Sequence, residues 1–206
     1  MKKNLTIIFL TTIFVLATSI VALAQDATFN ATRTFLFDPD NNGGVSADWI
    51  DGIGERDFNG RTNFGLRLEK VDAPDAAGVI LRGLRNVEIQ AGDLLGFDYL
   101  IGTPCTGGSP RFNVDYRLPD GSPAFSFVGG CGNDNEQTPA STPGWNRVRF
   151  DLQDPGEAFP VIPVGSTIDD ISLVVDELGQ YNVDNIRFRT EVADRPGRSN
   201  TVSPSY

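Results

Sequence analysis

The sequence predicts an all-β fold, an antiparallel β-sandwich of about nine strands. Short runs in which apolar and polar residues alternate recur along the chain, and clusters of Gly, Pro, Asn and Asp separate them. No apolar pattern keeps a helical period for three turns, and the best helical candidate, residues 50–58, is interrupted by Gly52 and Gly54. With 206 residues, the chain is long enough for one ordinary domain.

The expected strands share an alternating pattern, which is clearest in residues 146–152 (NRVRFDL). One face of each strand is expected to bury Val, Ile, Leu and Phe, and the other to present Arg, Asp and Asn. The strands are expected at residues 34–38, 63–70, 78–84, 93–101, 111–118, 124–128, 146–152, 170–176 and 182–190. The domain is thus expected to span residues 25–190. Residues 191–206 are polar and show no periodicity, so they are predicted to form a disordered tail.

The first 24 residues have the features of a secretory signal peptide. Lys2 and Lys3 precede an almost wholly apolar run over residues 5–21, and residues 22–24 (ALA) form a small-x-small cleavage signal. A retained membrane helix is the alternative, since the run approaches spanning length. Polar residues directly after the cleavage signal favour removal. We therefore expect a secreted protein, extracellular or periplasmic, with no membrane contact once the signal is cleaved.

Two cysteines, Cys105 and Cys131, are expected to form a disulfide in an oxidising compartment. A hairpin over residues 111–128, folded about the turn at residues 119–122 (PDGS), brings both cysteines toward its open end. The disulfide would then join two glycine-rich loops, residues 102–110 and 129–144. A redox-active pair is the alternative, but the C-x-x-C spacing is missing.

Composition excludes several functions. The chain contains no histidine, which excludes Ser-His-Asp and Cys-His catalysis and His-ligated zinc. A net charge of −10 with scattered basic residues predicts no nucleic-acid partner. No nucleophile elbow, phosphate loop or dinucleotide fingerprint occurs in the sequence, so no enzyme activity is expected. Glycoside hydrolysis by two carboxylates stays as the alternative.

Four groups of residues follow one another in a recognisable order. They are Phe37-Asp38 with Gly44 and Trp49; residues 65–68, Leu84 and residues 91–99 (AGDLLGFDY); residues 143–148 (PGWNRV); and residues 168–173 with 181–188 (YNVDNIRF). In this order they resemble the motifs of jelly-roll carbohydrate-binding modules, which belong to the broad galactose-binding-like superfamily. The resemblance covers about residues 28–190. It implies a β-sandwich of jelly-roll type.

The resemblance also implies a structural calcium ion. In such modules a carboxylate of the first strand and the aspartate of a final D-N-I strand hold the ion, and these positions correspond to Asp38 and Asp184 here. Calcium prefers six to eight hard oxygen ligands, which backbone carbonyls can complete. The alternative is that Asp184 and Asn185 only terminate hydrogen bonds at a sheet edge or loop.

A second indication of calcium is local. Asp38, Asp40 and Asn42 alternate and are followed by glycine, as in the D-x-[DN]-x-[DN]-G start of a calcium loop. The twelfth position, where that loop places a bidentate glutamate, is Trp49. Because Asp, Asn, Pro and Gly also make ordinary tight turns, a turn without an ion is the alternative.

The predicted function is that of a secreted, non-catalytic carbohydrate-binding-like module that recognises an extracellular, cell-wall or cell-surface glycan. Tyr99 and Tyr116 are the candidate stacking rings, and Asp98 and Arg111 the candidate hydrogen-bonding groups. Tyr116 alternates with polar residues on an expected central strand, whereas both tryptophans resemble core residues. The alternative is a secreted structural or cell-surface interaction protein with no free-sugar ligand, which the scarcity of exposed aromatic residues favours.

Overall fold

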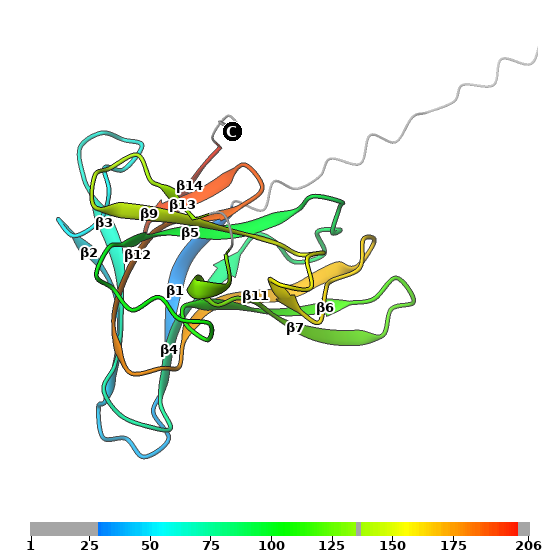
Figure 1. The fold of residues 1–206 in the computed structure, drawn as a ribbon, viewed down its shortest axis with the longest axis horizontal. Helices are drawn as coiled ribbons and strands as arrows, with labels where there is room; N and C mark the ends of the chain where they lie inside the picture. The colour runs from blue at the N-terminus through cyan, green and yellow to red at the C-terminus, as the bar shows by residue number, and fades with distance from the viewer. Residues whose placement is uncertain (1–28, 135–136, 202–206) are drawn as a thin grey trace, which may run out of the picture.

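The structure, a computed structural model, describes residues 29–134 and 137–201. Within these ranges it consists of fourteen β-strands and one short 3-10 turn (Figure 1). The predicted signal peptide, residues 1–24, lies outside the described residues. The strands are β1 (Asn30–Phe37), β2 (Val45–Asp51), β3 (Phe64–Lys70), β4 (Ala76–Arg82), β5 (Leu94–Leu100), β6 (Arg111–Arg117), β7 (Pro123–Gly129), β8 (Thr138–Pro139), β9 (Trp145–Asp151), β10 (Ala158–Phe159), β11 (Thr167–Val175), β12 (Gly179–Phe188), β13 (Glu191–Arg195) and β14 (Arg198–Thr201).

The strands form two antiparallel sheets. One has six strands in the order β1-β4-β11-β6-β7-β10, and the other has eight, with β14-β13-β12-β5-β9-β8 as its path and β2 and β3 joined to β12. Figure 1 shows β5 and β9 of the eight-stranded sheet lying over β6, β7 and β11 of the six-stranded sheet. The predicted antiparallel β-sandwich of jelly-roll type is confirmed, and each of the nine expected strands is present with shifted ends.

Strand β12 lies at the centre of the eight-stranded sheet and changes its neighbour halfway. One edge pairs with β5, while the other pairs first with β3 through Val183 and then with β13 from Ile186. Between these points Asn185 has a positive φ of 47°, and the register with β5 shifts. Asparagine tolerates this left-handed conformation, and the resulting bulge bends the strand toward its second neighbour.

The core lies between the two sheets. Phe97 of β5, Phe112 of β6 and Phe150 of β9 are fully buried, and their ring centroids lie 5.9 to 6.4 Å apart. Both tryptophans are structural, as expected. Trp145 is 4% exposed, and Trp49 packs against the core while its Nε1 donates a hydrogen bond to the carbonyl of Ala31.

The prediction of a disordered tail from residue 191 is wrong. Residues 191–201 form β13 and β14, and Val192 pairs with Arg187 of β12. Val192 and Ala193 are fully buried. Two apolar residues are too few to show a strand-like alternation in the sequence. Their burial, together with the backbone pairing to β12, is enough to hold β13 in the sheet. The domain therefore extends beyond residue 190, and residues 202–206 lie outside the described range.

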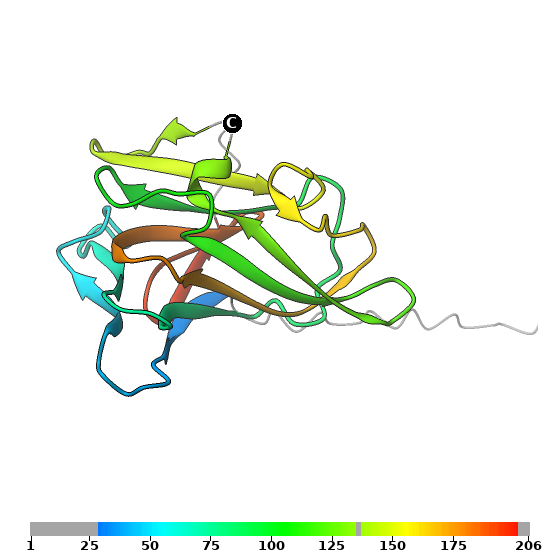
Figure 2. The ribbon, with the colours of Figure 1, turned by 60° about the horizontal axis from the view of Figure 1, so that its bottom comes forward.

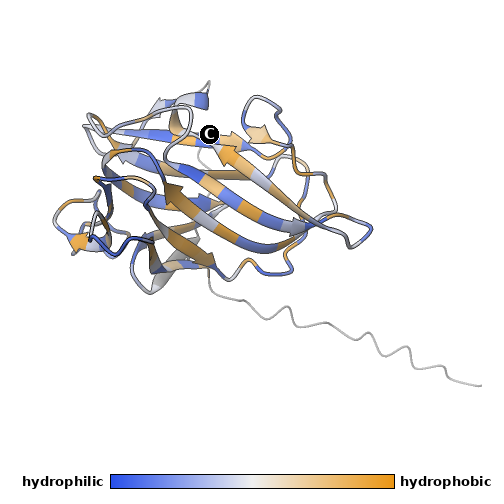
Figure 3. Cartoon of the chain, turned by 90° about the horizontal axis from the view of Figure 1, so that it is seen from below, coloured by the Kyte–Doolittle hydropathy of each residue, from blue (hydrophilic) through white to orange (hydrophobic). Residues whose placement is uncertain are grey.

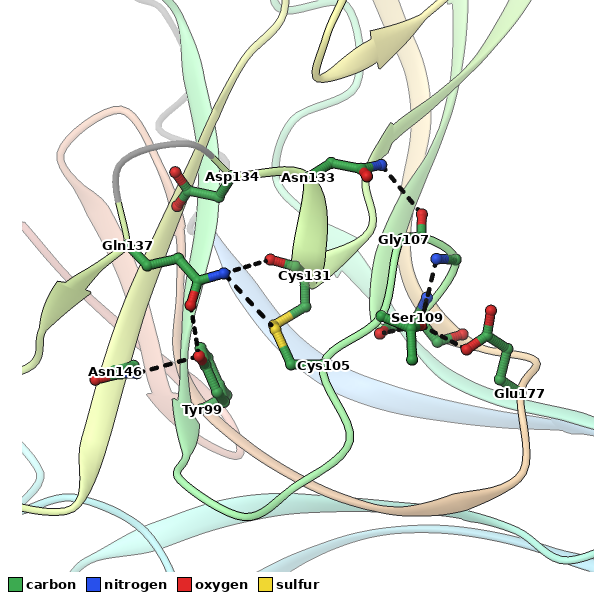
Figure 4. The surroundings of a disulfide bond; sticks show 12 residues. Tyr99, Cys105, Gly107, Ser109, Cys131, Asn133, Asp134, Gln137, Asn146 and Glu177 are labelled. Atoms are coloured by element: carbon green, nitrogen blue, oxygen red, sulfur yellow. Dashed lines mark hydrogen bonds between the residues drawn. A yellow bond between two sulfur atoms is a disulfide. The ribbon is translucent and has the colours of Figure 1, made fainter.

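The predicted disulfide is present and joins the open end of a hairpin. Cys105 and Cys131 have their sulfur atoms 2.00 Å and their Cα atoms 4.9 Å apart (Figure 4). Strands β6 and β7 pair along their whole length around the turn at Asp120-Gly121. Figures 1 and 2 show this turn projecting past the neighbouring loops.

Among the described residues, no helix is long and apolar enough to cross a membrane.

Candidate functional site

The outer face of the six-stranded sheet carries an unusual mixture of side chains. On β6, Phe112 and Val114 are fully buried, so the period of two places Arg111, Asn113 and Asp115 on the opposite face. Figure 3, seen from below, shows hydrophilic and hydrophobic residues alternating along the strands of this sheet. The centre of the outer face is therefore polar, as in an ordinary solvated sheet.

Strand β7 and the short edge strand β10 differ from that pattern. Phe125 and Phe127 are 38% and 42% exposed, and Phe159, which pairs with Phe127 across the strands, is 44% exposed. The rings of Phe125 and Phe127 lie edge to face with centroids 4.8 Å apart. We call the outer surface of β6, β7 and β10 the aromatic face. Apolar side chains that are grouped on a surface make a candidate binding surface, whereas single exposed ones are ordinary.

The sequence pattern does not predict these three exposed phenylalanines, because phenylalanine in an alternating strand is expected on the buried face. The register of the β6–β7 hairpin determines which face Phe125 and Phe127 take. Tyr116 pairs with Ala124, and Asp115 with Phe125, so Phe125 shares the face of the polar residues of β6. Ser126, the buried residue between Phe125 and Phe127, faces inward and donates a hydrogen bond to the carbonyl of Pro160.

Arg111, a predicted ligand-binding residue, does lie on the aromatic face. Its guanidinium group lies 4.7 Å from the ring centroid of Phe127 and forms two hydrogen bonds, of 2.6 and 2.7 Å, with Asp176. Hydrogen bonding from Arg111 lowers the pKa of Asp176. Arg111 Nε and the neighbouring Asn113 Oδ1 have no hydrogen-bond partner within the described residues. Both atoms are buried, so a bound water can satisfy them but a ligand on the surface does not contact them.

Two facing carboxylates complete the surface. Asp115 of β6 pairs with Asp170 of β11, and it also pairs with Phe125 on its other side. Desolvation and the charges of Asp170 and Asp169 raise the pKa of Asp115. The phenylalanine rings of the aromatic face therefore lie at the edge of the sheet, on β7 and β10, and polar side chains lie nearer the centre of the sheet, on β6.

The two predicted tyrosines do not lie on this surface. Tyr116 is 2% exposed and belongs to the core, because its neighbours Asp115 and Arg117 take the opposite face. The prediction that Tyr116 is a stacking ring for a sugar is therefore wrong. Tyr99 is 6% exposed and its hydroxyl donates to Gln137 Oε1 at 2.7 Å. Figure 4 shows Gln137 between Tyr99 and Cys131, whose carbonyl accepts from Gln137 Nε2 at 3.0 Å. Tyr99 thus stabilises the loop that carries Cys131, through its hydrogen bond to Gln137.

Asp98, the other predicted hydrogen-bonding group, is inaccessible to a ligand. Its side chain is fully buried and accepts two 2.9 Å hydrogen bonds from Arg147, while Arg149 and Arg187 lie within 3.8 Å. Burial alone would raise the pKa of Asp98, but the hydrogen bonds and charges around it hold the pKa below its usual value. The assignment of Asp98 to a ligand-binding surface is wrong, since it anchors an ion-pair network.

The same network contains Asp184 and Glu55. Asp184 accepts hydrogen bonds from the backbone amides of Glu55 at 2.7 Å and Asn185 at 2.6 Å. The Asn185 side chain donates to Glu55 Oε2 at 2.6 Å and to Asp98 Oδ2 at 3.1 Å. Burial raises the pKa of both Glu55 and Asp184. These contacts attach the loop between β2 and β3, which carries Glu55, to the centre of the eight-stranded sheet.

The predicted metal residues separate into two places. Asp38 and Asp40 lie with Asp75, and each offers an oxygen within 4.8 Å of those of the other two. Asn42 belongs to the same loop and donates a 3.1 Å hydrogen bond to Asp40. Asp184 belongs instead to the Asp98 network. The predicted calcium site shared by Asp38 and Asp184 is therefore wrong, because the two residues lie in different places. The sequence did not predict Asp75 as a member of the cluster.

The two packed antiparallel sheets place the protein among the β-sandwich proteins by architecture. No family model matches the chain, and no curated protein matches it. A similar solved structure comes from work on the promiscuous specificity of the carbohydrate-binding modules from the β-sandwich superfamily. The TM-score is 0.39 at 16% identity, and the match covers 79% of this chain and 57% of that one. This chain therefore corresponds to little more than half the length of that structure.

Proposed function

We propose that the protein is a secreted, non-catalytic binding module that recognises an extracellular or cell-wall glycan through its aromatic face. The observation that carries the proposal is the cluster of Phe125, Phe127 and Phe159, exposed side by side at the edge of the sheet. The apolar faces of sugar rings pack against aromatic rings, and sugar hydroxyls need donors and acceptors beside them. Asn113, which pairs with Phe127, and the exposed Asp115, which pairs with Phe125, offer a side-chain amide and a carboxylate on the same face.

Secretion is part of the proposal and is supported by two independent features. The first 24 residues have the charge and hydropathy pattern of a signal peptide. The Cys105–Cys131 disulfide fits an oxidising compartment.

A second candidate function is attachment to a protein partner, with no sugar ligand. One observation favours it, because the rings of the aromatic face are all phenylalanines. Within residues 29–134 and 137–201, every tyrosine and tryptophan is buried or only partly exposed, so none presents its ring on the surface for a sugar. Phenylalanine clusters suit a protein surface as well as a sugar ring.

The test is a binding panel of soluble and insoluble polysaccharides, measured with the purified protein by depletion and by affinity electrophoresis. Saturable binding to one glycan class is expected. The double variant Phe125→Ala/Phe127→Ala should lose about tenfold or more of its affinity, because two stacking contacts are removed. Its Tm should fall by only a few degrees, since both side chains lie on the outer face of the sheet and outside the core.

The matched control is Phe58→Ala, because Phe58 is 51% exposed but lies on the loop between β2 and β3, away from the aromatic face. This variant should bind like the wild type. Equal losses in both variants would contradict the location of the site. Absence of binding by the wild type across the whole panel would contradict the glycan function and favour the protein partner.

A further inference from the structure

The pairing of two neighbouring strands brings distant aspartates together at one end of the six-stranded sheet. Strands β1 and β4 are antiparallel, and the last residue of β1, Phe37, pairs with the first residue of β4, Ala76. Asp38 directly follows β1 and Asp75 directly precedes β4, so the two lie side by side at this end. Asp40 of the loop after β1 joins them, and the three carboxylates approach within 4.8 Å of one another.

Asp75 is the unusual member of this group. It is fully buried, and neither carboxylate oxygen has a hydrogen-bond partner in the described part of the chain. A buried carboxylate without partners is costly, and the charges of Asp38, Asp40 and Asp72 add repulsion. Lys70 is the cation that opposes them, but its ammonium group donates to the carbonyl of Asp176 at 2.7 Å.

The loop after β1 is folded around carboxylate and amide oxygens. Asp38 accepts hydrogen bonds from the backbone amides of Asn42 and Gly43, both at 3.0 Å. The side chain of Asn42 donates to Asp40 and to Asp72, both at 3.1 Å, which ties this loop to the one before β4. Each carboxylate retains lone pairs beyond those used in these bonds.

Gly44 keeps space open beside the buried carboxylate. A Cβ atom at this position would lie 2.7 Å from Asp75 Oδ2 and 2.8 Å from Asn42 Oδ1. Any side chain here would therefore fill the space between two oxygen atoms that come from different loops. The backbone amide of Gly44 donates to the same Asn42 Oδ1 at 2.7 Å.

We propose that Asp38, Asp40, Asn42 and Asp75 hold a calcium ion at this end of the six-stranded sheet. All the groups on offer are hard oxygens on loops, which suits the six to eight flexible ligands of calcium better than the strict octahedron of magnesium. The loop begins like a D-x-[DN]-x-[DN]-G calcium loop, and Asp75 takes the part of the acidic residue that this loop otherwise carries at its twelfth position.

The site differs from the pair expected from the sequence, because Asp75 from the start of β4 replaces Asp184 of the other sheet. The ion would fasten the loop after β1 to the start of β4. The proposal does not depend on the glycan-binding function, and binding of calcium is measured without any sugar.

The experiment is thermal unfolding of the purified protein in EDTA, in calcium and in magnesium, together with isothermal titration of calcium. Calcium at about 100-fold above its Kd should raise Tm by about 5–10 °C for a domain of this size. Magnesium at the same concentration should give a smaller shift. Failure of calcium to bind or to raise Tm would overturn the proposal, and an equal shift with magnesium would overturn the choice of ion.

Two variants test the residues, and a third is the control. Asp75→Asn should abolish the calcium shift and, in EDTA, should have a higher Tm than the wild type, because it removes a buried charge without partners. Asp40→Asn, at an exposed loop position, should weaken calcium binding at least tenfold without loss of folding. Asp48→Asn, an exposed position on β2, should respond to calcium like the wild type. A calcium response retained in Asp75→Asn, or lost in Asp48→Asn, would overturn the assignment.

Discussion

Replacing both Cys105 and Cys131 with alanine removes a cross-link between positions that are 26 residues apart. Chain-entropy reasoning relates the stabilisation to the length of the closed loop, and for a loop of this size it gives about 3.5 kcal/mol at 25 °C. In a domain of this length, 1 kcal/mol corresponds to about 2–4 °C, so the expected loss in Tm is about 7–14 °C. The weak hydrogen bond from Gln137 Nε2 to Cys105 Sγ, at 3.9 Å, is lost with the sulfur, whereas backbone bonds such as Cys131 N to Pro110 O at 3.0 Å survive the substitution.

The assay is urea and thermal unfolding of the double variant, followed by circular dichroism, beside the wild type with and without a reductant. The reduced wild type is the control, and its Tm should match that of the variant to within a few degrees. A loss of less than about 2 °C in both would refute the reasoning. The unfolded chain would then keep the two cysteine segments close together without the cross-link, so that the disulfide removes little entropy from it.

Two further predictions concern charged residues. Arg147→Ala leaves the buried Asp98 short of its bidentate partner and should cost about 3–5 kcal/mol in urea unfolding, whereas Arg117→Ala breaks an exposed ion pair and should cost at most about 1 kcal/mol. Equal costs would show that burial of Asp98 does not govern the network. Asp115→Asn should raise Tm at pH 7 but not at pH 3. The raised pKa of Asp115 means that wild-type stability falls, relative to the variant, as pH rises from the ordinary pKa of this carboxyl through its raised pKa in the folded protein. A Tm difference that does not change with pH would contradict this.

The sequence was sufficient for the fold because alternation reports directly on burial. Residues 146–152 alternate strictly, and in β9 the apolar members Val148 and Phe150 are fully buried. Strand β2 escaped prediction because residues 50–58 were assessed as a possible helix and its first residues were not assigned. Strand β13 escaped because its order comes from pairing with β12, which is a tertiary contact that local periodicity does not encode.

The candidate sites were less predictable, for a different reason. The type of a residue indicates which chemistry its side chain can perform. Whether that side chain is exposed depends on the register of its strand with the neighbouring strand. Tyr116 and Phe125 differ by one step of alternation relative to the β6–β7 turn, and that step decides which ring is exposed. Asp75 has no local motif at all. Only the pairing of β1 with β4 places Asp75 beside Asp38, and the local sequence does not encode that pairing.

The position of β11 and β12 has a consequence for how the protein is made. Strand β11 lies between β4 and β6, and β12 lies between β5 and its neighbours β3 and β13, so both sheets receive a central strand late in the chain. A nascent chain shorter than about 175 residues therefore has unpaired edges on β4 and β6. Such edges attract other strands and aggregate. The domain is thus expected to fold only after β11 and β12 have been synthesised.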